Sequence, residues 1–163
     1  LLGMERTVFY GGVVVMIGHI GLAVLPGLVG VGVGLVCVAL GSGALKANAS
    51  SLLGTLYGKG DPRADGGFTL FYLGINLGAF VGPLLTGLLQ TRIGFHWGFG
   101  AAAVGMALGL TQYVIFRRNL GEHGRHVPNP LPRSAITKTI AVMVAGLLVI
   151  GVAVVLELIT LAN

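Results

Sequence analysis

Five long apolar segments make up most of this chain and restrict what it can fold into. They cover about residues 8–25, 28–57, 67–89, 95–116 and 136–161. A helix needs about 20 apolar residues to cross the hydrocarbon core of a bilayer, with a range of roughly 17–25. Inside lipid the backbone must satisfy its own hydrogen bonds, so a helix is the expected form of each segment. The sequence therefore predicts an all-α, polytopic membrane protein with about five transmembrane helices.

The composition supports lipid as the solvent for most of the chain. Hydrophobic residues make up 55% of it and charged residues only 9%, whereas a soluble domain carries about 25% charged residues. A net charge of +5 would suggest a nucleic-acid partner for a soluble chain, but here we expect the lipid bilayer as partner and no nucleic acid. The single cysteine, Cys37, cannot form an internal disulfide and has no metal-ligand partners nearby, so no metal site is predicted.

The basic residues are distributed unevenly over the loops. Because successive loops alternate between the two sides of the membrane, eight basic residues fall on one side and one, Arg92, on the other. The eight are Arg6, Lys59, Arg63, Arg117, Arg118, Arg125, Arg133 and Lys138. Cytoplasmic loops carry the excess of Lys and Arg. We therefore predict a multi-pass protein of the plasma membrane, with the loops near residues 1–7, 58–66 and 117–135 in the cytoplasm.

The chain divides into three predicted parts. Residues 1–116 hold four spans, residues 117–135 form the only long polar stretch, and residues 136–163 hold one additional transmembrane helix. The polar stretch contains three prolines that oppose a continuous helix, and we interpret it as a cytoplasmic linker. The chain begins without a methionine and ends beside an apolar run, so we expect it to be an internal piece of a longer protein.

Lys46 is the only charged residue inside the second span. It lies 13 residues before Lys59, or about 20 Å along a helix, and an ammonium group at such a depth costs at least about 2.5 kcal/mol. One interpretation is a lysine that extends to the inner interface, although its side chain reaches only about one helical turn. The other is a lysine that faces a wet cavity and pairs with a carboxylate. No acidic residue of this chain is placed to pair with it, so the partner would come from another part of the protein.

Asn76 is the second candidate, because a buried amide in the middle of a span needs hydrogen-bond partners. It either bonds to another helix or accepts a hydrogen bond from a substrate amine. Tyr72 lies one turn earlier on the same helix face and could line the same cavity. His19 is interpreted as a packed, neutral imidazole. Catalytic residue combinations are missing from the sequence, so no enzyme is predicted.

Glycines recur with helical spacing in several spans. Gly74, Gly78 and Gly82 lie four residues apart in the third span, which predicts close helix–helix contact. The alternative role is bending, for which Gly41 and Gly43 beside Lys46 are candidates.

Two of these segments resemble motifs of one family. The sequence GSGALKANAS at residues 41–50 and the sequence FYLGINLG at residues 71–78 resemble the fourth-helix and fifth-helix motifs of the proton-dependent oligopeptide transporters (POT, or PTR), within the major facilitator superfamily. Residues 94–99 and 2–7 resemble the family's sixth helix and the superfamily's loop between helices two and three. The resemblance implies helices three to six of an N-terminal six-helix bundle, followed by the first helix of the hairpin between the two bundles.

The resemblance also implies a function and roles for the candidate residues. It implies proton-coupled symport of di- and tripeptides, driven by the proton gradient without a cofactor. Lys46 would pair with a glutamate of the first helix, and Asn76 would hold the peptide's N-terminal amine. Ala47 departs from the family pattern, in which a proline often follows the lysine. The missing N-terminal helices and C-terminal bundle would be partners from the same protein. Alternatives are a same-family transporter of nitrate or amino acids and a non-transporting membrane scaffold.

Overall fold

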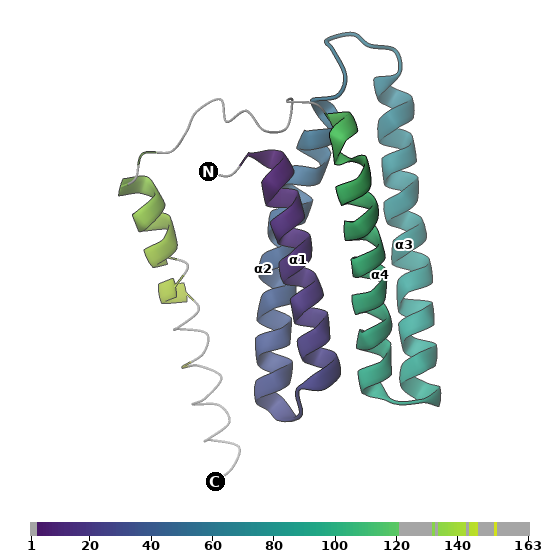
Figure 1. Ribbon diagram of the computed structural model, residues 1–163, viewed down its shortest axis with the longest axis vertical. Coiled ribbons are helices and arrows are strands. Elements are labelled where there is room, and N and C mark those ends of the chain that lie inside the picture. The colour runs from purple at the N-terminus through teal and green to yellow at the C-terminus, as the bar shows by residue number, and fades with distance from the viewer. Residues whose placement is uncertain (1–2, 121–131, 133, 143, 147–151, 153–163) are drawn as a thin grey trace. The chain divides into compact units, whose positions relative to one another are not determined.

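The structure is a computed structural model that describes residues 3–120, 132, 134–142, 144–146 and 152. Four long helices follow one another in the first part of the chain (Figure 1). They are α1 (Met4–Val24), α2 (Gly27–Gly54), α3 (Ala64–Arg92) and α4 (Phe95–Phe116), and a short 3₁₀ helix, η1 (Arg117–Leu120), continues from α4. All four are long and apolar enough to cross a membrane. The predicted helical, polytopic fold is confirmed, and four of the predicted spans correspond to these helices.

The helices pack unequally against one another. α1 packs most extensively against α2 and also against α4, while α3 packs against α4 and barely meets α2. No residue of α3 is buried. The apolar side chains of α3 therefore face lipid or other parts of a larger protein, because α4 alone covers little of this helix.

Glycines allow α1 and α2 to approach closely. A Cβ atom on Gly41 would lie 2.6 Å from the carbonyl oxygen of Gly11, and a Cβ atom on Gly18 would lie 2.8 Å from the carbonyl oxygen of Gly34. The two pairs are seven residues apart on each helix, as expected for one contact line between antiparallel helices. Small residues are the usual means of close helix contact in membranes. In contrast, a Cβ atom on Gly74, Gly78 or Gly82 would meet nothing within 4 Å.

Short turns join the helices into antiparallel pairs. α1 and α2 are connected through Leu25 and Pro26, and α3 and α4 through Ile93 and Gly94. Gly94 has φ +138°, a backbone conformation that side-chain-bearing residues rarely adopt.

The longer loop between α2 and α3 contains an ion pair at 2.9 Å between the Arg63 guanidinium and the Asp61 carboxylate. Arg63 donates hydrogen bonds to both carboxylate oxygens, which holds the pKa of Asp61 below its usual value.

The described residues after η1, from Pro132 on, belong to a second unit of the chain. Its described residues 134–142 and 144–146 are helical. Most of the remaining predicted fifth span, residues 136–161, lies outside the described residues. In the predicted linker, residues 117–120 form η1, and residues 121–131 and 133 also lie outside the described part.

Candidate functional site

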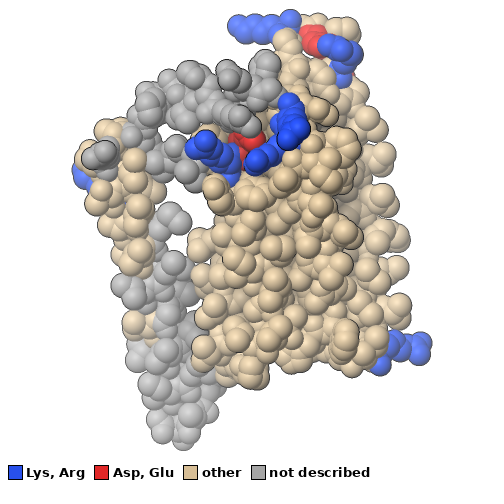
Figure 2. All heavy atoms as spheres, viewed as in Figure 1, with Lys and Arg blue, Asp and Glu red and all other residues tan. Residues whose placement is uncertain are grey.

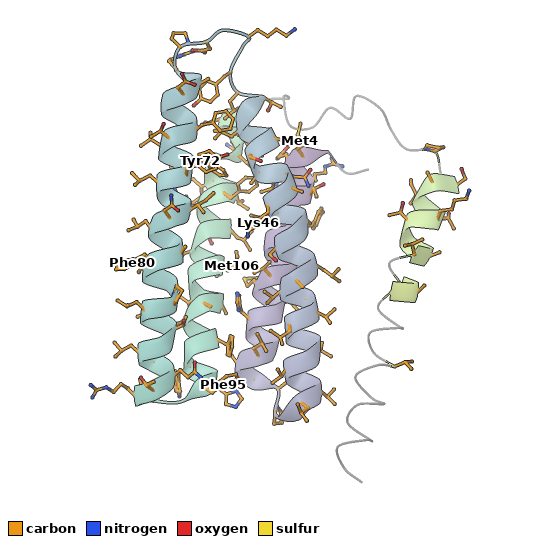
Figure 3. All side chains as sticks on the ribbon, turned by 180° about the vertical axis from the view of Figure 1, so that it is seen from behind. Met4, Lys46, Tyr72, Phe80, Phe95 and Met106 are labelled. Carbon is orange, nitrogen blue, oxygen red and sulfur yellow. The ribbon has the colours of Figure 1, made fainter. Side chains whose placement is uncertain are left out.

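Lys46 and Tyr72 lie on sides of α2 and α3 that face the region beside α4 (Figure 3). Both side chains are exposed in this chain, Tyr72 to 54%. Met106 on α4 lies in the same region of the view.

Contacts near the ends of α2 and α3 fix which side of α3 faces α2. A Cβ atom on Gly54 would lie 3.7 Å from the ring of Phe68, so the Phe68 side of α3 is turned toward α2. The rings of Phe68 and Tyr72 are 6.5 Å apart. Residues four apart are neighbours on a helix surface, so Tyr72 adjoins both Phe68 and Asn76. Asn76 lies two turns beyond Phe68 and about 80° around α3 from it.

Lys46 and Asn76 also lie at about the same depth. Lys46 is eight residues before Gly54 on α2, and Asn76 is eight residues after Phe68 on α3. Because the two helices are antiparallel, both residues are about 12 Å from the point where the helices approach each other, at 1.5 Å per residue. An ammonium group and a carboxamide therefore lie at one level on two neighbouring helices.

Among the described residues, no hydrogen bond or ion pair involves the side chains of Lys46, Asn76 or Tyr72. Polar and charged groups inside a membrane normally face a bundle interior or a water-filled cavity and mark pathways for substrates or protons. A cation, an amide and a phenol on facing helices can bind a small solute that carries both a charge and hydrogen-bonding groups.

Two other polar residues of the spans make contacts within this unit. Asn48 donates a hydrogen bond from its side-chain amide to the carbonyl oxygen of Ala44, at 2.8 Å. His19 is half-buried, and its ring stacks on Phe99 of α4 with the centroids 6.3 Å apart. The stacking agrees with a packed imidazole. Glu157, the acidic residue of the predicted fifth span, lies outside the described residues.

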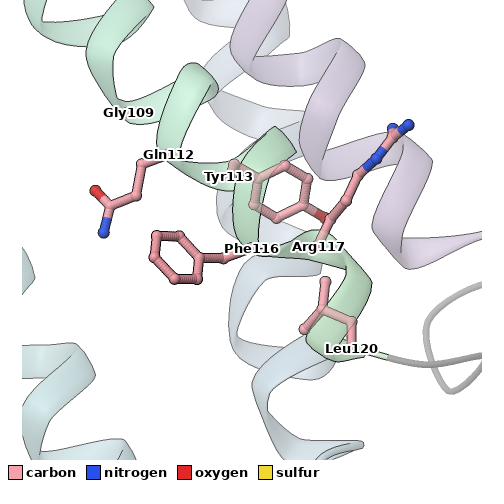
Figure 4. Close-up of a pocket in the computed structure, with 6 residues that line it drawn as sticks. All are labelled: Gly109, Gln112, Tyr113, Phe116, Arg117 and Leu120. Atoms are coloured by element: carbon pink, nitrogen blue, oxygen red, sulfur yellow. The ribbon is translucent and has the colours of Figure 1, made fainter.

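Two contacts that the sequence did not predict join α1 to α4 near both ends. The Tyr113 hydroxyl donates to the backbone oxygen of Glu5 at 3.1 Å, and Nδ1 of His96 lies 3.2 Å from the backbone oxygen of Leu22. They link residues more than 70 positions apart, so no local pattern could have indicated them. Tyr113 also borders a cavity of about 290 Å³ on α4. Figure 4 shows Gln112 and Phe116 on one side of this cavity and Tyr113 and Arg117 on the other.

The membrane-spanning helices and the intramembrane polar residues define a class of protein, a multi-pass α-helical membrane protein. Residues 5–157 match the sequence profile of the POT family. The chain belongs to this family, as the two motifs suggested.

Individual relatives support the same assignment. The chain is 47% identical to the uncharacterized transporter YclF of Bacillus subtilis (strain 168) and 43% identical to a di-/tripeptide transporter of Lactococcus lactis subsp. lactis (strain IL1403). These matches cover 92% and 89% of the chain. A crystal structure of a peptide transporter POT in complex with sulfate is 48% identical, covers 93% of the chain and superposes with a TM-score of 0.83.

The chain is much shorter than these relatives. It spans 31% of YclF, 30% of the Lactococcus transporter and 31% of the crystallised chain.

Proposed function

We propose that this chain is part of a proton-coupled symporter of di- and tripeptides in the plasma membrane. The observation that carries the proposal is the position of Lys46 and Asn76 at one depth on the neighbouring helices α2 and α3. The 43% identity to a di-/tripeptide transporter supports peptides over the alternatives of nitrate, amino acids or a scaffold role. The proton gradient supplies the energy, and no cofactor is needed.

Each residue has a distinct proposed role. The side-chain carbonyl of Asn76 accepts a hydrogen bond from the N-terminal ammonium of the peptide, and Tyr72 lines the same cavity one turn away. Lys46 pairs with a carboxylate from outside this chain and is released when that carboxylate binds a proton. Proton binding and peptide binding are then coupled, because both change the charges around one cavity.

The proposed organisation follows the family. Residues 1–116 belong to an N-terminal six-helix bundle, residues 117–135 link it to the next part, and residues 136–163 add a transmembrane helix. The loops near residues 1–7, 58–66 and 117–135 lie in the cytoplasm. Alternating access requires two bundles that move around a shared site, so the full-length transporter, rather than this chain, performs the transport.

Uptake into liposomes tests the proposed function directly. The full-length transporter that carries this chain should accumulate labelled dialanine when the outside is acidic, and a protonophore should abolish the accumulation. Accumulation that resists the protonophore would exclude proton coupling. Uptake of nitrate or free alanine in place of dialanine would support the other substrates, and uptake of none of the three would support a scaffold.

Asn76→Ala is expected to weaken peptide binding by about tenfold to a hundredfold. Hydrogen bonds to charged groups contribute about 1.5–3 kcal/mol, and each 1.4 kcal/mol corresponds to about tenfold in affinity. Binding of a labelled dipeptide to the purified full-length variant measures the change. Asn48→Ala is a matched control, because its amide bonds to the backbone of its own helix, and it should bind peptide normally. Equal affinities for wild type and Asn76→Ala would exclude the amine contact.

A further inference from the structure

An apolar groove runs along the contact between α1 and α4. Its volume is about 370 Å³. Phe9, Val13 and Met16 form the α1 wall, and Ala107, Val114 and Ile115 form much of the α4 wall. Thr111 is the polar residue of the lining, and its hydroxyl donates to the backbone oxygen of Ala107 at 2.8 Å. The groove therefore offers no unsatisfied polar side chain to an occupant.

The groove opens on the outer side of the four-helix unit. α3 approaches α4 at Gly98, where a Cβ atom would lie 2.9 Å from the backbone oxygen of Thr86. Gly109 and Phe116 lie on the same side of α4 as Gly98, and they line the cavity shown in Figure 4. Ala107 is two residues before Gly109, and Val114 is two residues before Phe116. Two residues correspond to a rotation of about 200° around the helix, so Ala107 and Val114 lie on the opposite side of α4. The groove thus faces away from α3 and from the candidate peptide site.

Two arginines lie at one end of the groove. Arg6 is one turn before Phe9 on α1, Arg118 is three residues after Ile115, and both are exposed. Figure 2, in which α1 and α4 face the viewer, shows Lys and Arg side chains with an acidic side chain among them at the upper end of this face, and an uncharged surface over the middle of the face below them. The neighbouring Glu5 is only 4% exposed, so it presents little anionic surface beside the arginines.

We propose that this groove binds an anionic phospholipid from the membrane leaflet that contains the N-terminal end of α1. One acyl chain lies along Phe9, Val13 and Met16, and Arg6 and Arg118 contact the phosphate group. The α1 wall is about 10 Å long, from the seven residue steps between Phe9 and Met16 at 1.5 Å each, which matches the part of an acyl chain nearest the headgroup. Guanidinium groups suit this role, because they bind phosphate through paired hydrogen bonds.

Charge and polarity together favour a lipid over another occupant. An apolar groove without cations would fit any acyl chain or an apolar helix. The two exposed arginines add a requirement for negative charge at one end only, as in an anionic phospholipid. Basic residues beside the membrane attract such lipids. The proposal concerns a surface that faces away from the peptide site and does not depend on the transported substrate.

Lipid retention in native mass spectrometry tests the proposal with the full-length transporter. The purified protein is mixed with phosphatidylglycerol and phosphatidylcholine of identical acyl chains. Wild type should retain phosphatidylglycerol preferentially, and the double variant Arg6→Gln/Arg118→Gln should lose about fivefold in retention for each arginine removed. Lys59→Gln changes the same charge in the loop between α2 and α3, and it should retain the lipid as wild type does.

Filling the groove tests the acyl-chain contact separately. Ala107→Phe should reduce retention of phosphatidylglycerol, whereas Val104→Phe, at an exposed position outside the groove lining, should not. Equal retention of both lipids by wild type, or unchanged retention in the arginine double variant, would overturn the proposal. Unchanged retention in Ala107→Phe together with a lower Tm would also overturn it, because a protein segment would then fill the groove.

Discussion

Lys46→Ala is expected to abolish proton-driven peptide accumulation by the full-length transporter without preventing its insertion into the membrane. Removing one partner of a buried ion pair leaves the other charge uncompensated, at a cost of about 3–5 kcal/mol. If the coupling carboxylate loses its ammonium partner, it holds its proton more strongly and no longer releases it in each transport cycle. Accumulation of labelled dialanine in liposomes under an inward proton gradient should fall by about a hundredfold or more.

Two controls separate coupling from general damage. Lys59→Ala removes the same side chain from the loop between α2 and α3 and should transport normally. Peptide exchange without a proton gradient should persist in Lys46→Ala to a greater extent than accumulation, if the lysine acts in coupling. Accumulation by Lys46→Ala at the wild-type level would show that the lysine has no part in it.

The number and position of the first four spans could be predicted from the sequence, because apolar length is a local property. Helix ends were less predictable. The second span was predicted to continue to residue 57, since Leu56 and Tyr57 are apolar. α2 instead ends at Gly54, and Tyr57 turns its side chain toward Gly67 at the start of α3. Hydropathy reports that such a residue is apolar, but it does not distinguish a helix from a turn that packs on the next helix.

The candidate site could be predicted only in part. The spacing of Tyr72 and Asn76 places both on one face of a helix, whatever that helix contacts. Their relation to Lys46 depends on where α2 and α3 meet, and the contact between Gly54 and Phe68 sets it. The groove with Arg6 and Arg118 depends similarly on the packing of α1 against α4. Residues more than 100 positions apart meet there, and a single sequence contains no local signal for such a pair.

Glycine spacing in the sequence also predicts the packing of the helices only in part. The glycines of the second span look alike in the sequence, and both packing and bending were open for Gly41 and Gly43. The structure separates the two residues. Gly41 lies against the backbone of α1, whereas a Cβ atom on Gly43 would meet nothing within 4 Å. Gly41 therefore allows α1 and α2 to pack closely, whereas no neighbour in this unit restricts the size of the side chain at position 43.

Gly41→Ala is expected to destabilise the full-length transporter, although alanine is the better helix former by about 1 kcal/mol. The added Cβ atom would lie 2.6 Å from the backbone oxygen of Gly11 and 2.7 Å from the backbone nitrogen of Val15. Backbone atoms cannot rotate away as a flexible side chain can, so α1 and α2 must separate along their contact line. Overpacking of this kind typically costs about 1–3 kcal/mol, and the contact between α1 and α2 is the most extensive one between the helices that the structure describes. We expect a lower Tm and a smaller monodisperse fraction in size-exclusion chromatography.

Gly43→Ala is the matched control for this effect, since it makes the same change on the same helix two residues away. Without a neighbour within 4 Å, the new methyl group should leave Tm unchanged or raise it through helix propensity. The difference between the two variants therefore isolates the contact between α1 and α2 from the intrinsic preference for alanine. Equal Tm values for Gly41→Ala and Gly43→Ala would mean that α1 and α2 do not approach each other as closely as the structure indicates. A lower Tm for Gly43→Ala alone would instead place the tighter helix contact on the opposite face of α2, toward parts of the transporter outside this chain.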